Sequence, residues 1–503
     1  MDSFLGIDLG TSSVKVMLID RTGLVRATRS RGYPIYQPQP GYAEQSPDGW
    51  WEATRLCISD LVDGGEIKGD ELKSIGLSGQ MHGLVLLDAG GNALGNAIIW
   101  PDRRTTQICA EWAAQGQAFH HVTGMPLATG FLAPSLEWVK RHEPERYRLA
   151  TRFILPKDYI RLRLTGRIAT DPSDACGTYL FDIRSRQWSR NTIHAFQLNE
   201  SLLPDVVETL SVAGTLTEEA ATQTGLPRGT PVIAGGSDQA MAALALGADQ
   251  PGKVAVALST GGTVITTVMS PLTDPRMHTL CHAYKDRWLM MGAMMSAGSS
   301  MSWLKDNVLL SAPETGTSQP ALTFEELAGW AEEVPAGSNG LFFLPYLSGE
   351  RTPHMNPNAK GCFIGLTLSH TRAHMARSIM EGVMFSLHNS VEVLQELRLP
   401  VDEVLCYGGG SKSQTWRQIM ADVFALPIQW RLFSDYSALG AAAAAARASG
   451  ADISLENSFE SSTESLLPRS ENAQIYMARR STFKRIYDQL KGIFEELSEF
   501  PAS

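Results

Sequence analysis

Two short turns rich in glycine, serine and threonine are the part of this sequence best suited to bind an anion. They are residues 10–13 and residues 259–262, and each lies between two apolar segments. Small side chains let a ligand approach the backbone closely, and successive N–H groups form a concave anion-binding surface. Either turn alone is typical of a plain β-hairpin. The two together, with glycines 408–410 as a third backbone-exposing turn, favour binding of a nucleotide polyphosphate.

Two aspartates and one histidine add groups that could act at such a site. Asp8 comes two residues before the first turn, where a carboxylate would lie beside a Mg²⁺ ion that bridges phosphates. Asp238 follows a glycine-ended strand at the expected start of a helix, where we expect it to stay ionised and to accept a hydroxyl proton. Asp238 could equally cap that helix, and spacing does not separate the two roles. His82 has glycine nearby on both sides, but a lone histidine is more often structural.

The elements that must position these residues follow one pattern twice. Residues 4–20 and 253–268 each predict an apolar strand, a small-residue turn and a second strand. Their spacing of about half the chain predicts an internal duplication. We therefore expect an α/β protein with two domains, 1–248 and 249–503, each a mixed sheet flanked by helices, with the active site between them.

Composition excludes several classes of protein. The 503 residues are 43% apolar, and 43 basic against 53 acidic residues give a net charge of −10, without the basic stripe of a nucleic-acid binder. Six dispersed cysteines predict neither a disulfide framework nor a zinc site. The sequence has no apolar run long enough to cross a bilayer and no secretory signal, so we expect a cytoplasmic protein. Residues 247–253 resemble the start of a Walker A loop, but Val254 replaces the required hydroxyl and a strand is expected to follow.

Several segments resemble the FGGY carbohydrate kinases of the actin-like ATPase superfamily, over nearly the whole chain. They are residues 6–11 with Lys15, 155–159 with 165–166, 170–178, 343–354 with 361 and 365–367, 381–382, and 408–410 with Trp416, 421–422 and 440–442. Segment 343–354 is the most specific, since unrelated actin-like proteins lack it. The resemblance implies two ribonuclease-H-like lobes that bind ATP, Mg²⁺ and a small sugar.

The resemblance also implies roles for single residues. Asp238 would be the catalytic base, and Asp8 would lie by the metal. The residues that would contact the sugar are Asp238, Gln80, Met81, His82, Trp100, Asp102, Arg104 and Gln239. Those that would bind ATP are Thr11, Ser12, Lys15, Thr260, Gly261, Gly298, Gly409, Gly410 and Ser413. The expected partners are the sugar and ATP, without nucleic acid or membrane, and a homodimer is left open.

Residues 79–83 are similar to the substrate segment of family members that phosphorylate D-xylulose, which implies transfer to its 5-hydroxyl. Pro101 and Gln239 depart from the usual asparagines near the sugar, so another pentulose or polyol (ribulose, erythritol, ribitol, glycerol) is the alternative substrate. Ser135 stands where lysine is common, and residues 259–262 read Ser-Thr-Gly-Gly in place of Gly-Thr-Ser-Gly. Two other classes are an actin-like ATPase without a sugar site and a nucleotide sensor without turnover.

Overall fold

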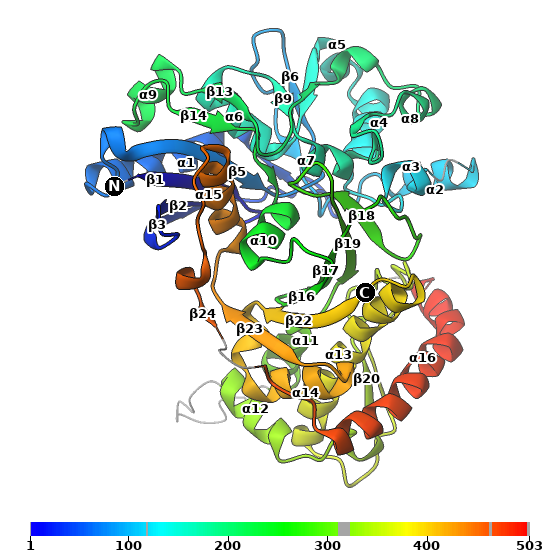
Figure 1. The fold of residues 1–503 in the computed structure, drawn as a ribbon. Helices are drawn as coiled ribbons and strands as arrows, with labels where there is room; N and C mark the ends of the chain where they lie inside the picture. Colours follow the sequence, from blue (N-terminus) through cyan, green and yellow to red (C-terminus); the bar gives the residue numbers. More distant parts are fainter. Residues whose placement is uncertain (1, 117–118, 310–321, 462–464, 500–503) are drawn as a thin grey trace, which may run out of the picture. The chain divides into compact units, whose positions relative to one another are not determined.

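The computed structural model describes residues 2–116, 119–309, 322–461 and 465–499 (Figure 1). The chain forms two compact units and passes between them more than once. Unit 1 comprises Met1–Asp249, Thr267–Met290 and Asp435–Phe459, and unit 2 comprises Gln250–Thr266, Met291–Ser434 and Glu460–Ser503. Each unit is built around its own sheet.

The sheet of unit 1 contains the first predicted hairpin. Its strand order is β13-β14-β5-β1-β2-β3, with β15 also paired to β5. The strands are β1 (Ser3–Leu9), β2 (Ser13–Asp20), β3 (Val25–Gly32), β5 (Leu72–Gly79), β13 (Val212–Thr215), β14 (Pro231–Ile233) and β15 (Gly236–Ser237). β1 and β2 are antiparallel and β1 and β5 are parallel, which places Asp8 between Lys15 and Ser78 in the register. The hairpin expected over residues 4–20 is confirmed.

Alternation along β1 and β5 sends two kinds of side chain to the two faces of this sheet. Leu5, Ile7 and other branched residues join a buried core with α1 (Pro47–Asp63) and α6 (Pro156–Thr165). The alternating positions include Gly6 in β1 and Gly76 in β5, and α15 (Tyr436–Ala448) packs directly on these glycines (Figure 1). A Cβ at Gly6 would lie 2.2 Å from the Ala438 carbonyl oxygen, and one at Gly76 1.9 Å from that of Ala441. Glycine is therefore required where helix and sheet touch. α10 (Asp238–Leu246) packs against α15 in turn.

The sheet of unit 2 repeats the same topology. Its order includes β19-β17-β16-β22-β23-β24, in which β16 and β17 form an antiparallel hairpin and β22 is parallel to β16. The strands are β16 (Gly252–Leu258), β17 (Gly262–Val268), β19 (Trp288–Met294), β22 (Val401–Tyr407), β23 (Ile428–Leu432) and β24 (Glu460–Ser461). The hairpin over residues 253–268 and the α/β fold class are confirmed. A strand starts at Gly252, which agrees with rejecting a Walker A loop.

The remaining elements cover or extend these sheets. In unit 1 the other helices are α2 (Thr106–Ala114), α3 (His120–Thr123), α4 (Leu132–His142), α5 (Pro144–Leu149), α7 (Pro172–Ala175), α8 (Arg190–Ala195) and α9 (Glu218–Thr224). In unit 2 they are α11 (Gly298–Trp303), α12 (Phe324–Glu332), α13 (Arg372–Glu396), α14 (Gln414–Phe424) and α16 (Ser470–Ser498). Short strand pairs are β4 (Glu44–Gln45) with β7 (Ala97–Ile98), β6 (Val85–Leu87) with β8 (Arg152–Ile154), β9 (Ala169–Thr170) with β12 (Asp205–Val206), β10 (Phe181–Asp182) with β11 (Gln187–Trp188), and β20 (Phe342–Leu344) with β21 (Cys362–Ile364). β18 (His278–Cys281) lies beside α7.

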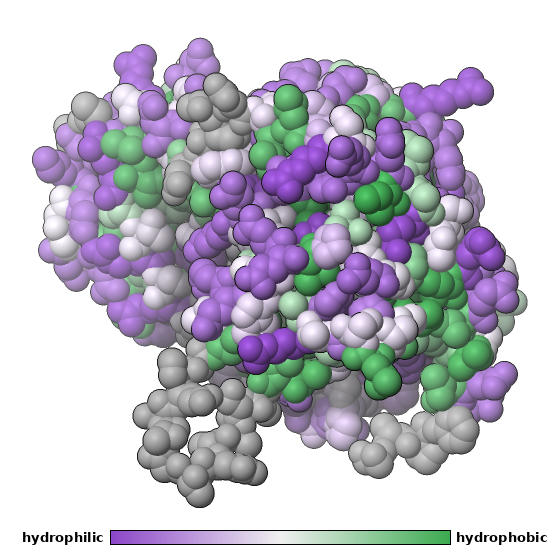
Figure 2. Space-filling view, turned by 90° about the horizontal axis from the view of Figure 1, so that it is seen from below, coloured by the Kyte–Doolittle hydropathy of each residue, from purple (hydrophilic) through white to green (hydrophobic). Residues whose placement is uncertain are grey.

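The exposed surface mixes residue types. Figure 2 shows hydrophobic residues interspersed with hydrophilic ones on the face that it presents. The described helices include none that is both long enough and apolar enough to cross a bilayer.

Candidate active site

The first turn, between β1 and β2, is fixed by hydrogen bonds from three other segments of unit 1. The Tyr33 hydroxyl donates to the Gly10 carbonyl oxygen. Gln45 Nε2 donates to the Thr11 carbonyl oxygen at 2.7 Å, and Trp100 Nε1 donates to Thr11 Oγ1 at 2.9 Å. The turn is therefore rigidly held, and Trp100, expected on the sugar side, is joined to the turn that is expected to bind phosphate.

Two carboxylates, Asp8 and Asp435, lie close to Lys15 at this turn. Lys15 Nζ forms an ion pair with Asp435, the residue before α15. Burial raises the pKa of Asp8 to about 6; Ser78 and Lys15 lower it and Asp435 raises it further. Asp8 Oδ1 is buried and has no hydrogen-bond partner within the described part of the chain. Such a hard oxygen suits Mg²⁺, which takes one or two carboxylates and completes its shell with phosphate oxygens and water. No group of three or more His, Cys, Asp or Glu among the described residues is arranged to hold a metal alone.

Asp238 is the first residue of α10, and it is not the cap of that helix. The N-cap is Ser237, whose Oγ accepts the Ala240 N–H at 3.3 Å. Asp238 Oδ1 accepts the N–H of the adjacent Gln239 at 2.7 Å. Burial, and then the nearby Asp8 charge, raise the pKa of Asp238 to about 7. The raised pKa argues against the expectation that this carboxylate stays ionised at neutral pH, because a helix start does not offset burial beside a second acid.

His82 lies in the connection after β5 in a strained conformation. Its φ is 73°, in the left-handed region, and its ring stacks on Phe131 with centroids 4.3 Å apart. Nδ1 lies 2.7 Å from the Gly177 carbonyl oxygen, so Nδ1 carries the proton of the neutral ring and Nε2 is the acceptor. A Cβ at Gly177 would lie 2.9 Å from Met81 and 3.0 Å from His82. This close packing holds Met81 and His82 in place. Strain of this kind is typical of functional sites.

The other predicted sugar-side residues, Gln80, Asp102 and Arg104, bond to one another or to residues 42–45. Arg104 donates to both Asp102 oxygens at 3.0 Å and to Glu44 at 2.7 Å. Its guanidinium also lies 4.0 Å above the Tyr42 ring. Both side chains of the Asp102–Arg104 pair are almost fully buried. This pairing supports the loop that carries Trp100. Gln80 donates to Gln45 Oε1 at 2.9 Å and thereby connects to the first turn.

In unit 2, the second turn lies against two glycine segments. The Gly298 N–H donates to the Ser259 carbonyl oxygen at 2.8 Å, and the Ala297 N–H donates to that of Thr260 at 3.0 Å. A Cβ at Gly408 would lie 2.8 Å from the Leu258 carbonyl oxygen. The turn at 259–261, the start of α11 and the 408–410 turn are thus brought together. Gly409 has open space at its Cβ position, and Ser413 caps α14.

Sequence reasoning missed Asp435, Gln45 and Tyr33, which hold the first turn from a distance in the chain. An aspartate before an alanine-rich run is a helix-start signal at Asp435, but it does not reveal Lys15 as partner. Residues 440–442, which the resemblance grouped with the adenosine site, pack in unit 1 against β1, β5 and α10.

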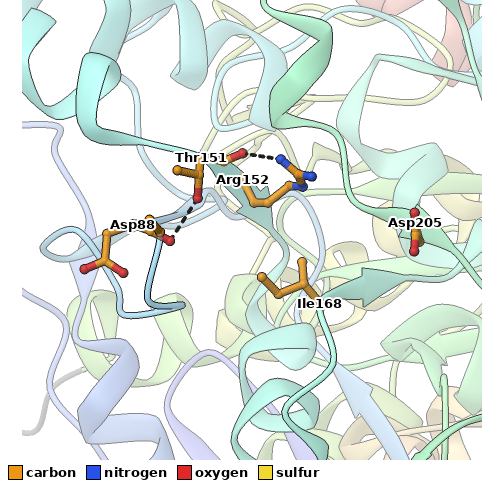
Figure 3. A pocket seen from close by; sticks show the side chains of 6 residues that line it. Asp88, Thr151, Arg152, Ile168 and Asp205 are labelled. Carbon is orange, nitrogen blue, oxygen red and sulfur yellow. Dashed lines mark hydrogen bonds between the residues drawn. The ribbon is translucent and has the colours of Figure 1, made fainter.

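A surface hollow elsewhere in unit 1 contains none of the predicted site residues (Figure 3). It has a volume of about 410 Å³ and is lined by Asp88, Ala89, Thr151, Arg152, Ile168 and Asp205. Asp88 Oδ1 accepts the N–H groups of Gly90 and Asn92. Arg152 donates to the carbonyl oxygens of Thr151 and Ser201.

Comparison with known proteins identifies the family. Residues 3–245 match the N-terminal domain of the FGGY family of carbohydrate kinases, and residues 254–449 match the C-terminal domain. The chain belongs to the FGGY family of carbohydrate kinases. Xylulose kinase of Bacillus subtilis is 37% identical to it over 506 residues, covering 99% of each chain.

Solved structures agree with this FGGY assignment. The crystal structure of xylulose kinase from Rhodospirillum rubrum has a TM-score of 0.91 and 31% identity, covering 98% of this chain and 100% of that one. Gluconate kinase from Lactobacillus acidophilus also has a TM-score of 0.91, with 28% identity and 99% coverage of both chains. This FGGY kinase therefore has the two-domain actin-like fold, and kinases of the family use ATP.

Proposed function

We propose that this FGGY kinase transfers the γ-phosphoryl group of ATP to the 5-hydroxyl of D-xylulose. The observation that carries the phosphoryl-transfer mechanism is the position of Asp238. Ser237 caps α10, so the Asp238 carboxylate is not used as the cap, and burial together with the Asp8 charge raises its pKa to about 7. Similarity to proteins named xylulose kinase supports the choice of sugar, as do Met81 and His82 in the substrate-like segment.

In this mechanism, Asp238 accepts the proton of the attacking sugar hydroxyl and orients that oxygen. A base with a pKa near the working pH combines a useful ionised fraction with sufficient basicity. His82 Nε2 accepts a hydrogen bond from a second sugar hydroxyl, while stacking on Phe131 keeps the ring in place. Trp100 and Gln80 line the same side through their bonds to the first turn.

Each of the two turns offers backbone N–H groups to phosphate, and Lys15 adds a cation at the first turn. Phosphoryl transfer has a loose transition state, so placing N–H groups and cations around the γ-phosphoryl contributes more than the strength of the base. Asp8 would hold Mg²⁺ through its unpartnered Oδ1, and the ion would supply positive charge beside the phosphates. We place the boundary between the two domains near residue 248, which is supported by family domains that end at 245 and begin at 254.

A polyol or sugar acid is the alternative substrate. The likeness to gluconate kinase from Lactobacillus acidophilus favours testing D-gluconate, because its TM-score equals that of a xylulose kinase. Pro101 and Gln239 are further reasons to test other pentuloses and polyols.

A coupled ADP-release assay tests the proposal. Wild-type protein is assayed with D-xylulose, L-xylulose, D-ribulose, D-gluconate, glycerol, erythritol and ribitol, and D-xylulose is expected to give the highest kcat/KM. Asp238→Asn should lower kcat by about 10³-fold or more while ATP binding persists. Asp205→Asn, in the exposed hollow of Figure 3, is the control acid-to-amide change and should leave kcat unchanged. Preference for another substrate would reject the D-xylulose assignment, and near-normal turnover of Asp238→Asn would reject the base.

A further inference from the structure

A fully buried charge cluster in unit 1 has no part in the mechanism above. Lys157 Nζ lies 2.6 Å from Asp158 Oδ1, 2.9 Å from Asp171 Oδ1 and 3.3 Å from Asp174 Oδ2. Arg161 Nη1 lies 2.9 Å from Asp158 Oδ1, and all five side chains have 0% exposure. Burial raises the pKa of Asp174 well above its usual range. Burying a charged group costs free energy unless the group is paired. The ion pairs of this cluster therefore hold the elements that carry them in one arrangement.

One carboxylate of this cluster orients the Ser173 hydroxyl. Asp171 Oδ2 accepts the Ser173 N–H at 2.8 Å, the Ser173 hydroxyl at 2.6 Å and the Thr209 hydroxyl at 2.6 Å. Because Ser173 Oγ donates its proton to Asp171, its lone pairs face away from that carboxylate. Ser173 Oγ accepts the Ser237 N–H at 3.0 Å. Ser237 is the cap of α10 and immediately precedes Asp238.

The charge cluster is carried by α6 and by α7 with its N-cap Asp171. These two helices also contact the backbone segment that precedes Asp238. Arg161 Nη1 donates to the Ala234 carbonyl oxygen at 2.9 Å. A Cβ at Gly236 would lie 2.7 Å from Ser173 Oγ, so this strand approaches α7 as closely as glycine allows. After α7, the chain reaches Gly177, whose carbonyl oxygen contacts His82. One short segment therefore contacts both the strand before Asp238 and the His82 ring.

We propose that Ser173 is a positioning residue for phosphoryl transfer: oriented by Asp171, its hydroxyl fixes the Ser237 backbone and thereby the direction of the Asp238 carboxylate. This inference rests on the proposed role of Asp238 as the base. Reacting atoms must meet within a narrow range of geometry, and a displacement of about 1 Å can cost about 100-fold in rate. Ser173 touches neither reactant, so its effect is on kcat.

The test compares Ser173→Ala with Thr209→Val. Both substitutions remove a hydroxyl that donates to Asp171 Oδ2 at 2.6 Å, but only Ser173 Oγ also accepts the Ser237 N–H. We expect Ser173→Ala to lower kcat by about tenfold or more, with KM for sugar and for ATP changed by less than about twofold. Thr209→Val should lower the melting temperature about as much as Ser173→Ala does, but it should keep kcat within about twofold of wild type.

Ser173→Cys keeps weaker forms of both hydrogen bonds and should give a kcat between those of the serine and alanine proteins. If Ser173→Ala does not fold, Ser173→Cys against Thr209→Val makes the same comparison. Equal kcat in the Ser173 and Thr209 variants, or a loss confined to KM, would overturn the positioning role. Asp238→Asn is run in parallel: an inactive Asp238→Asn with a normal Ser173→Ala rejects only this inference, whereas an active Asp238→Asn rejects the base itself.

Discussion

At the scale of single residues, the site contains a carboxylate, Asp238, whose pKa lies near neutral pH because of its surroundings. Asp8 and burial raise the pKa of Asp238 to about 7, and the desolvated Asp8 has a pKa of about 6. A carboxyl group with a pKa this high is only partly ionised at pH 7, so small changes around it alter the fraction of active base. This gives two predictions, one for rate and one for stability.

The rate should follow the ionisation of Asp238. A base acts only when unprotonated, and with a pKa of about 7 its ionised fraction rises about tenfold between pH 6 and pH 8. We expect kcat/KM for the sugar, which reports the free enzyme, to rise through an apparent pKa near 7. In His82→Asn the imidazole can no longer contribute to the profile, which should keep this rising limb. A flat profile from pH 5.5 to 8 would contradict the prediction.

Stability should change in the opposite sense. The pKa of Asp238 in the folded protein lies above its value of 3.8 in a free chain, so the folded state binds more protons between about pH 4 and pH 7. The contribution of Asp238 to stability is therefore present below pH 4 and is lost as the pH rises to 7. Relative to wild type, Asp238→Asn should gain more in melting temperature at pH 8 than at pH 5. Thermal melts at both values measure this, and a constant difference would refute it.

At the scale of elements, the site depends on a helix that contacts its sheet through backbone. α15 covers β1 and β5 at glycine positions, and it also contacts α10, whose first residue is Asp238. A Cβ at Gly440 would lie 1.9 Å from the Met241 carbonyl oxygen. The separation of α10 and α15 therefore cannot increase without moving the proposed base.

Gly440→Ala should lower both stability and kcat. Overpacking at a backbone contact costs about 1–3 kcal/mol, and displacement of α10 moves Asp238. Gly329→Ala is the matched control, because Gly329 lies within α12 and has nothing within 4 Å of its Cβ position. That change should stabilise by up to about 1 kcal/mol. Denaturant unfolding and kcat are measured for both variants, and equal effects would contradict the packing argument.

The sequence predicted the strands and helices that have strong local signals. It did not predict the helix cap or the contacts that depend on residues far apart in the chain. The hairpins at 4–20 and 253–268 follow from apolar segments around small-residue turns, and both are present. The start of α10 at Asp238 was expected, but the choice of Ser237 as the cap required its Oγ geometry. Lys15 pairs with Asp435, and Ser173 accepts the Ser237 N–H. The partners are far apart in the chain, so no periodic pattern in the sequence predicts these contacts.

At the scale of the whole molecule, the two units carry different groups of predicted site residues. Unit 1 contains Asp8, Lys15, His82 and Asp238, and unit 2 contains the second turn and Gly408–410. The shared strand order of the two sheets supports their origin by duplication. On the proposed function, a substitution at His82 in unit 1 should affect the sugar, whereas one beside the second turn in unit 2 should affect ATP.

His82→Asn and Gly298→Ala test that division. Asparagine tolerates the φ of 73° at position 82, so the change removes the ring with little backbone strain. We expect KM for the sugar to rise about tenfold while KM for ATP is unchanged. A Cβ at Gly298 would lie 2.5 Å from the Ser259 carbonyl oxygen, so Gly298→Ala should raise KM for ATP instead. Effects on the same substrate in both variants would contradict the division.

The return of residues 435–459 to unit 1 has a consequence for synthesis on the ribosome. The first 249 residues emerge long before α15, so the glycine-lined face of β1 and β5 stays uncovered while unit 2 is being translated. A nascent chain stalled before residue 435 should therefore bind chaperones through this uncovered surface, and emergence of α15 from the ribosome should end that binding.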